Sequence, residues 1–299
     1  MHNLKESFDK VLPIIQTLLK NDVNEAGNIP KPGPKPKFSD SEIITLSLIS
    51  DSLLIDSEHY LFKILHNQSV FHHLIERSVY NRRKRALSPL LNKVRMGLVE
   101  KLISYEDTFV LDSMPVEICK FVRAKRIKIC KEHEQTSPSF GFCAAKKQTY
   151  FGYKLHGVCT MGGIITDFDM SKGNMSDIHY LNDIRDRYNN CTLLGDKGYL
   201  CNELQTELFE KNRLLLQTPM RSNQKNFKRQ PAVFRKVRKR IETIFSQLCD
   251  HFMIRRNYAK TFIGLATSIL SKITSFTLLQ YINKFITNRP LNHVKHALF

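Results

Sequence analysis

The sequence predicts an α/β protein in which a helical N-terminal region is followed by a mixed sheet flanked by helices. Before residue 105, apolar residues recur at the spacing of amphipathic helices. After it, two short apolar runs, 107–112 and 191–195, read as central strands among further strand and helix patterns. A buried helical turn is the alternative for the first run, because periodicity alone does not separate the two.

The charge balance favours a nucleic-acid partner. The 299 residues include 46 Lys and Arg against 28 Asp and Glu, a net charge of +18, which attracts phosphate backbones or anionic membranes. No stretch approaches about 20 uninterrupted apolar residues, and the first residues show no signal-peptide pattern, so a membrane role is not expected. The seven cysteines form no Cys-x-x-Cys pair, and we expect free thiols in a reducing cytoplasm. A zinc site at Cys119, Cys130 and His133 is the alternative, but its spacing matches no common zinc site.

The first hundred residues read as a series of helices. Residues 4–20 form an amphipathic helix that packs or dimerises. Residues 27–37 contain four prolines, which exclude regular structure, so they form either a linker or an extended arm whose lysines follow a phosphate backbone. Ser39 and Asp40 are suitable caps for the helix that follows. Helices are expected around 43–49, 60–66 and 88–103.

A basic segment, 77–85, lies among these helices and includes Tyr80. A solvated basic face is the ordinary interpretation. Within a compact run of short helices, the segment favours a DNA-binding domain of helix-turn-helix type over residues 1–105, which also serves multimerisation. Its candidate DNA-binding residues are Arg82, Arg83, Lys84 and Arg85.

A β-hairpin is expected after a basic, irregular insertion at 114–148, which is either a surface loop or a second strip for phosphates. The β-rich runs 150–160 and 164–169 flank a glycine turn. A period of two puts Lys154 and His156 on one face, so both are candidates for DNA contact. The alternative is the polar face of a half-covered strand, and a general base at His156 is less expected.

The second aspartate of interest follows the second central strand. Residues 177–188 read as a helix capped by Ser176 or Asp177, and the strand 191–195 then leads into Asp196. Two central strands therefore each end on a carboxylate. A helix near 200–208 and a strand at 213–217 continue the alternation.

A third acid stands out in a basic stretch. Residues 211–241 contain eleven Lys and Arg and no acid, and Glu242 then lies beside the apolar stripe of a helix. Arg238 lies one turn earlier on the same side, so a surface ion pair between the two is the alternative interpretation. Residues 262–286 form a long core helix.

These three acids predict a metal site. Asp112, Asp196 and Glu242 can converge to bind two divalent ions, and Mg²⁺ or Mn²⁺ prefers carboxylates with substrate phosphate. Two such ions support in-line phosphoryl displacement. Asp167 and Asp169 are rival second carboxylates, but they lie in the hairpin and rank below Asp196.

Four motifs occur in order along the chain: Val110–Ser113, Gly152–His156, Gly195–Tyr199 and Arg238–Phe245. In them the chain resembles the DDE transposases of bacterial insertion sequences, most closely the insertion sequence 982 family. The resemblance implies an RNase H-like core with a five-stranded mixed sheet over residues 106–299, including C-terminal helices. It also implies that Asp112, Asp196 and Glu242 are the catalytic, metal-binding triad. A related motif has Tyr and Lys seven residues before and after the glutamate, where this chain has Arg235 and Cys249.

The predicted function is DNA transposition. The enzyme would cleave the ends of its element and use the freed 3′-OH to attack target DNA, acting as a homo-oligomer on terminal inverted repeats in the bacterial cytoplasm. The alternatives are a catalytically silent DNA-binding protein and a structure-selective nuclease with the same core. The residues expected to contact phosphate in the catalytic region are Lys197, Arg235, Arg238 and Lys239.

Overall fold

The computed structural model describes residues 4–67, 71, 73–144, 147–220, 227 and 231–296. The chain divides into two compact units, one formed by Met1–Leu102 with Leu248–Phe299 and the other by Ile103–Gln247. The C-terminal residues therefore group with the N-terminal helices. The functional division into residues 1–105 and 106–299 stays a prediction.

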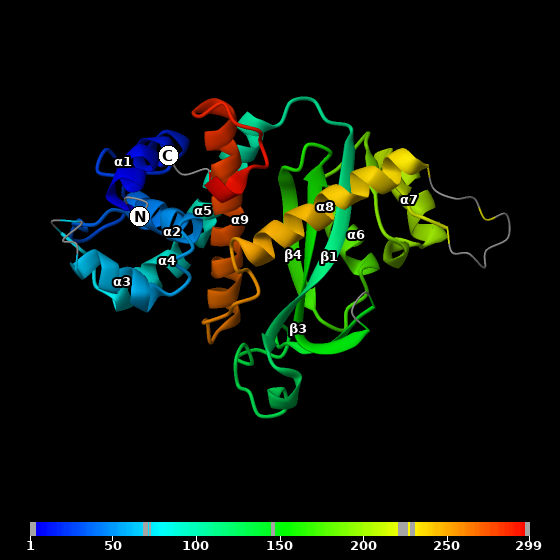
Figure 1. The fold of residues 1–299 in the computed structure, drawn as a ribbon, viewed down its shortest axis with the longest axis horizontal. Helices are drawn as coiled ribbons and strands as arrows, with labels where there is room; N and C mark the ends of the chain where they lie inside the picture. Colours follow the sequence, from blue (N-terminus) through cyan, green and yellow to red (C-terminus); the bar gives the residue numbers. More distant parts are fainter. Residues whose placement is uncertain are drawn as a thin grey trace. The chain divides into compact units, whose positions relative to one another are not determined.

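The first unit is helical, as the sequence predicts. Its core helix is α9, Phe262–Phe285, in which Ile269, Phe276 and Leu278 are fully buried. In the described part of the chain, α9 is the one helix long and apolar enough to cross a membrane, but 67% of its most apolar window is buried in the protein. The other helices are α1 (Leu4–Leu18), α2 (Asp40–Ser52), α3 (Glu58–Asn67), α4 (Arg77–Ala86) and α5 (Ser88–Leu102), drawn from blue to cyan in Figure 1.

The start of α2 follows directly from its sequence. The Ser39 side chain accepts a hydrogen bond from the Glu42 amide at 3.2 Å, and the Glu42 carboxylate accepts one from the Ser39 amide at 2.6 Å. This reciprocal arrangement satisfies two amides that the helix leaves unpaired. The predicted cap is confirmed, and residues 27–37 contain neither helix nor strand, also as predicted.

The second unit contains the mixed sheet. Its strands are paired in the order β2–β3–β1–β5–β6, and β4 pairs with β3 off this path. Strand β3 pairs antiparallel with β1 and β4, whereas β1, β5 and β6 are parallel. A short strand, β2, pairs with the first residues of β3. The α/β fold with a mixed sheet is confirmed. The strands are β1 (Thr108–Cys119), β2 (Ser139–Cys143), β3 (Gln148–Thr160), β4 (Ile165–Lys172), β5 (Thr192–Leu194) and β6 (Leu215–Gln217).

Helices cover both faces of this sheet. Val158 packs with the buried residues of α6 (Ile178–Ile184) and α7 (Asn202–Asn212). Its neighbour Gly157 faces the other side, since successive residues of a strand alternate. There, α8 (Ala232–Asp250) crosses the sheet (Figure 1), and Phe245 and Ile241 approach Gly157.

The structure corrects the predicted end of the first strand. The sequence suggests that the strand ends at Asp112, but β1 continues to Cys119. The reason is that pairing with β5 stops at Val110, whereas antiparallel pairing with β3 continues. The prediction of an irregular insertion over 114–148 is therefore wrong for the end of β1 and for β2. The hairpin of β3 and β4 is confirmed.

Candidate active site

Asp112 lies on β1 just after the residues that pair with β5, where only the pairing with β3 continues. It is two residues beyond Val110, the last residue paired with β5, and opposite Gly157 of β3. Its carboxylate accepts a hydrogen bond from the Ser113 amide at 2.8 Å. Burial raises the pKa of Asp112 to about 6, the Ser113 bond lowers it, and the other charges near it are Asp196, Arg238 and Glu242.

Asp196 reaches the same place through a tight turn after β5. A Cβ atom on Gly195 would lie 3.2 Å from Tyr199 and 3.3 Å from Leu111, so the chain packs closely against β1 here. The Asp196 side chain is 50% exposed, and its Oδ1 lies 3.1 Å from an Arg238 guanidinium nitrogen. The negative charge of Asp196 raises the pKa of Asp112, and the positive charge of Arg238, the partner of Asp196, lowers it.

The helix α8 brings the third acid. Its close approach depends on Gly157, because a Cβ there would lie 3.3 Å from the Phe245 ring. Glu242 is exposed on this helix, and its charge also raises the pKa of Asp112. Arg238 forms its ion pair with Asp196. The structure therefore does not contain the simple surface pair between Arg238 and Glu242 that was the alternative interpretation.

The charges of Asp196 and Glu242 act on Asp112, but the three acids do not form a metal-binding group in this structure. Among the described residues, no group of three His, Cys, Asp or Glu side chains is arranged closely enough to hold a metal ion. Carboxylate oxygens are nevertheless the ligands that a hard divalent cation prefers. A bound cation would offset the burial and the repulsion by two neighbouring carboxylates that raise the pKa of Asp112. Arg238 is the cation that the chain itself contributes to this group.

A fourth carboxylate, that of Asp177, organises the surroundings. Its Oδ1 accepts hydrogen bonds from the Ser113 hydroxyl at 3.0 Å and from Lys154 at 3.1 Å. A Cβ on Gly198 would lie 3.1 Å from its Oδ2, so the turn after Asp196 packs against this group. Asp177 thus contacts the neighbours of both aspartates. The sequence indicated only a helix cap, and although Asp177 stands at the N-cap of α6, its side chain makes no capping bond.

Comparison with known protein families gave one match. The family described as transposase DDE domain matches residues 105–278, which is 174 of the 299 residues. This chain belongs to the DDE transposase family. Neither the curated proteins nor the solved structures gave a match. Members of this family act on DNA and generally use divalent metal ions. Membership therefore implies the enzyme class of nucleases and transposases.

His156 of the transposase is part of the fold's interior. It is 1% exposed, stacks on Tyr180 with ring centroids 4.8 Å apart, and shares a hydrogen bond of 2.7 Å with the Ser171 hydroxyl. Burial lowers its pKa to about 4, against the opposing effect of Asp177. Lys154 donates to the Met175 carbonyl as well as to Asp177. These positions give no support to the predicted DNA contacts of His156 and Lys154.

The other predicted DNA-binding residues separate into two groups. Arg83 pairs with the buried Asp40 at 2.6 Å and donates to the Phe38 carbonyl, while Lys84 lies 4.0 Å from Glu58. Arg85 is half-buried and donates to a backbone carbonyl of its own helix. The exposed candidates are Arg82, Lys197, Arg235 and Lys239.

Of the two rival carboxylates of the hairpin, Asp167 already has a basic partner. Asp167 is 7% exposed and pairs with Arg187 at 2.5 Å. Asp169 lies opposite His156 on β4, and burial raises its pKa. Neither contributes to the charges that act on Asp112. The ranking of Asp196 above both stays a prediction.

Proposed function

We propose that this DDE transposase cleaves DNA at the ends of an insertion sequence of the 982 family and joins the freed 3′-OH to target DNA. The observation that carries the proposal is that α8, which carries Glu242, packs against Gly157 directly opposite Asp112, while Arg238 of the same helix pairs with Asp196. A carboxylate group of this kind, in a chain with a net charge of +18, suits a site that binds cations and a polyanion together.

In this proposal Asp112, Asp196 and Glu242 would be the residues that hold two Mg²⁺ or Mn²⁺ ions. When bound, such ions stabilise the attacking and leaving oxygens of phosphoryl transfer. Arg238 steadies the Asp196 carboxylate and lies where a substrate phosphate can be neutralised. The exposed cations Lys197, Arg235 and Lys239 contact the DNA backbone in a sequence-independent way.

Asp177 has a positioning role in the same proposal. By accepting from Ser113 and Lys154, it holds the strand that carries Asp112 and supports the turn that follows Asp196. It therefore acts through its neighbours rather than on the DNA itself.

The remaining assignments follow from this activity. Residues 1–105 would supply recognition of the terminal repeats and multimerisation, and residues 106–299 would supply catalysis. The transposase would act as a homo-oligomer on DNA in the bacterial cytoplasm, associated with the nucleoid.

The decisive experiment measures nicking of end DNA with Mg²⁺ or Mn²⁺ by wild type and by Asp112→Asn, Asp196→Asn and Glu242→Gln. Each variant should lose cleavage, because an amide is a poor ligand for a hard cation. DNA binding should be retained. The melting temperature should be unchanged or higher, since removing a charge from crowded acids relieves repulsion. The control is Asp186→Asn, which neutralises an exposed acid of the same unit and should leave nicking intact.

The outcomes separate the alternatives. Near-normal nicking by Glu242→Gln would exclude Glu242 from the site. A wild-type protein that binds end DNA with metal present but never cuts it would be the silent DNA-binding protein. Cleavage without joining of the 3′ end to a second duplex would indicate the nuclease.

A further inference from the structure

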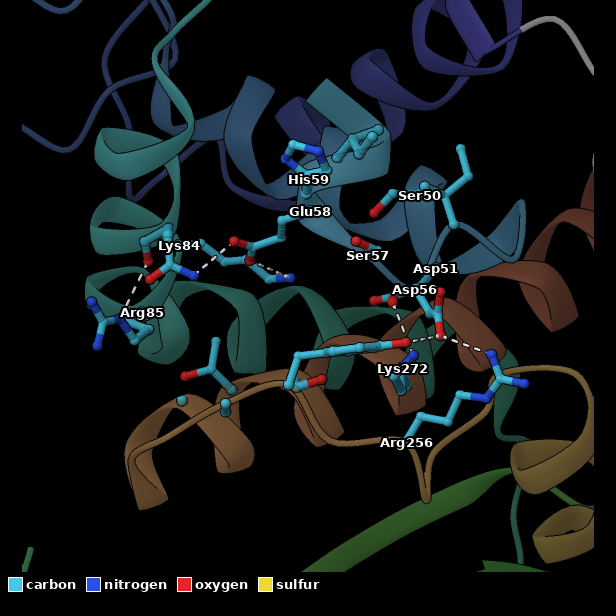
Figure 2. A pocket seen from close by; sticks show the side chains of 18 of the residues that line it. Ser50, Asp51, Asp56, Ser57, Glu58, His59, Lys84, Arg85, Arg256 and Lys272 are labelled. Carbon is cyan, nitrogen blue, oxygen red and sulfur yellow. Dashed lines mark hydrogen bonds and ion pairs between the residues drawn. The ribbon is translucent and has the colours of Figure 1, made fainter. Parts of the chain in front are cut away.

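The helical unit contains a pocket that the proposed chemistry does not use. Its volume is about 510 Å³, and all its lining residues belong to the unit formed by residues 1–102 and 248–299. The lining comes from the end of α2, the start of α3 and the segment between them, from α4, and from α9 with the residues that precede it. Figure 2 shows Arg85 and Arg256 on different sides of this pocket, with Asp56 and Lys272 between them.

The lining carries an excess of positive charge. Six Lys and Arg residues line the pocket against three Asp and Glu. Each of the three carboxylates already has a basic partner: Asp51 with Lys272 at 3.4 Å, Asp56 with Arg256 at 3.3 Å, and Glu58 with Lys84 at 4.0 Å. Within the described residues, the structure gives no carboxylate partner to the other three cations, which are Arg77, Arg85 and Lys260.

Two of these three cations stand where they do not help the fold. Arg77 is the first residue of α4, and Lys260 immediately precedes Thr261, the N-cap of α9. The beginning of a helix carries partial positive charge, so a cation there is locally unfavourable. Stability alone would favour an acid at either position. Cations that oppose their own helices while lining a cavity indicate that the cavity is suited to an anion.

The paired residues form a fixed frame around the unpaired ones. The Asp56 carboxylate accepts from the Tyr258 hydroxyl at 3.1 Å and from Arg256, which ties the segment before α9 to the start of α3. Glu58 accepts from Asn81 at 2.8 Å, which ties the same region to α4. Lys260 and Arg77 lie on the two segments that these contacts hold.

We propose that this pocket binds a phosphodiester group of the DNA backbone through Arg77, Arg85 and Lys260. The proposal rests on the proposed function, because that function supplies DNA as the substrate. Such a contact would fix the orientation of the helical unit on DNA without reading sequence. It extends the predicted DNA surface from α4 to Lys260, in the segment before α9. Free phosphate esters share the same chemistry, so the experiment must separate them from DNA.

The test uses the full chain with the double variant Arg77→Gln/Lys260→Gln. Binding to a labelled duplex is followed by fluorescence anisotropy between about 50 and 200 mM salt. The variant should bind on the order of tenfold more weakly at low salt. Its slope of log affinity against log salt should fall by about two, because each substituted cation would no longer neutralise a phosphate. The control is Lys20→Gln/Lys63→Gln, which removes the same charge from exposed positions outside the pocket and should stay close to wild type.

Three results would overturn the proposal. An equal loss of DNA affinity in the pocket variant and in the control would show that only the net charge of the protein matters. Unchanged DNA affinity in the pocket variant, together with a loss of thermal stabilisation by inorganic phosphate or a nucleoside monophosphate, would make the pocket a small-anion site. Absence of DNA binding by the wild type would reject the proposed function itself. Melting temperatures of both variants confirm that any difference arises in the folded protein.

Discussion

The basic helices α4 and α8 look alike in the sequence, yet their cations are used differently. In α4, Arg83 pairs with the buried carboxylate of Asp40, and Lys84 lies near Glu58 and 5.9 Å from the centre of the Tyr80 ring. In α8, Arg235 and Lys239 remain exposed, and Arg238 pairs with a proposed metal ligand, Asp196. The two central cations of α4, Arg83 and Lys84, thus stabilise tertiary structure, whereas the cations of α8 surround the candidate active site.

The role of a basic run therefore depends on the acids that its side chains contact. Asp40 is 2% exposed and also accepts from the Ile29 amide, so Arg83 compensates a charge that the fold has already buried. No such buried acid faces the outer side of α8 in the described residues. Substitutions should therefore separate the cations that hold the fold from the cations left for DNA.

The largest expected effect follows from Arg83→Met. Removing the guanidinium leaves Asp40 buried without its ion partner, so the free energy of unfolding should fall by about 3 kcal/mol or more. The matched change Arg82→Met, at the exposed neighbouring position, should alter it by no more than about 0.5 kcal/mol. Urea unfolding of both variants measures this. Similar stabilities would abolish the distinction within α4.

The next prediction concerns the buried His156. Its pKa is lowered to about 4, whereas in the unfolded chain it stays near 6.5, so the unfolded state binds the proton more tightly. Stability is therefore complete above pH 6.5 and is lost as pH falls from there towards 4, by about 2 to 3 kcal/mol. The charged groups that face this histidine are Asp177 and Lys154. In His156→Gln, the unfolding free energy should lose this part of its pH dependence. An unchanged profile would contradict the assignment.

A smaller effect is expected from Asp177→Asn. Outer groups that orient ligands typically contribute 10- to 100-fold to activity, and we expect a loss of about that size in nicking of end DNA. A merely structural role would lower the melting temperature and leave the requirement for Mg²⁺ unchanged. A positioning role should instead raise the Mg²⁺ concentration needed for half-maximal nicking, with DNA affinity unaffected. Full activity at every Mg²⁺ concentration would remove Asp177 from the site.

The smallest effect tests the outer side of α8. Arg235→Gln/Lys239→Gln should weaken duplex binding uniformly across sequences and reduce the salt slope by about two. Stability should change by no more than about 0.5 kcal/mol, because both side chains are exposed. If the variant instead lost its preference for one DNA sequence over another, α8 would be reading bases and not only contacting the backbone.

Local patterns in the sequence predicted much of the fold. The Ser39 cap, the hairpin of β3 and β4 and the apolar α9 each depend on residues close together in the chain. The extension of β1 was missed because Pro115 and Glu117 interrupt the apolar pattern of a strand whose later residues pair with β3 instead of β5.

The site was only partly predictable for the same reason. The two aspartates and Glu242 could be identified from the elements that carry them, although their metal-binding role is still a prediction. The partner of Arg238 could not be identified, because Asp196 lies on another element. Helical spacing instead suggests Glu242, four residues later, as the partner. Nor could alternation in β3 show that the face with His156 would be covered by Tyr180. Pairing across elements depends on packing that a single sequence pattern does not contain.

The position of α9 has a consequence for synthesis of the protein. Chains emerge from the ribosome N-terminus first, and domains that are contiguous in sequence can fold as they appear. The helical unit cannot, since its central helix, Phe262–Phe285, is made after the whole sheet. The buried side chains of α2 and α5 therefore wait for almost the entire chain. Any product truncated before α9 would lack the core of this unit. Such a product would be bound by chaperones or degraded by proteases and would not act on DNA.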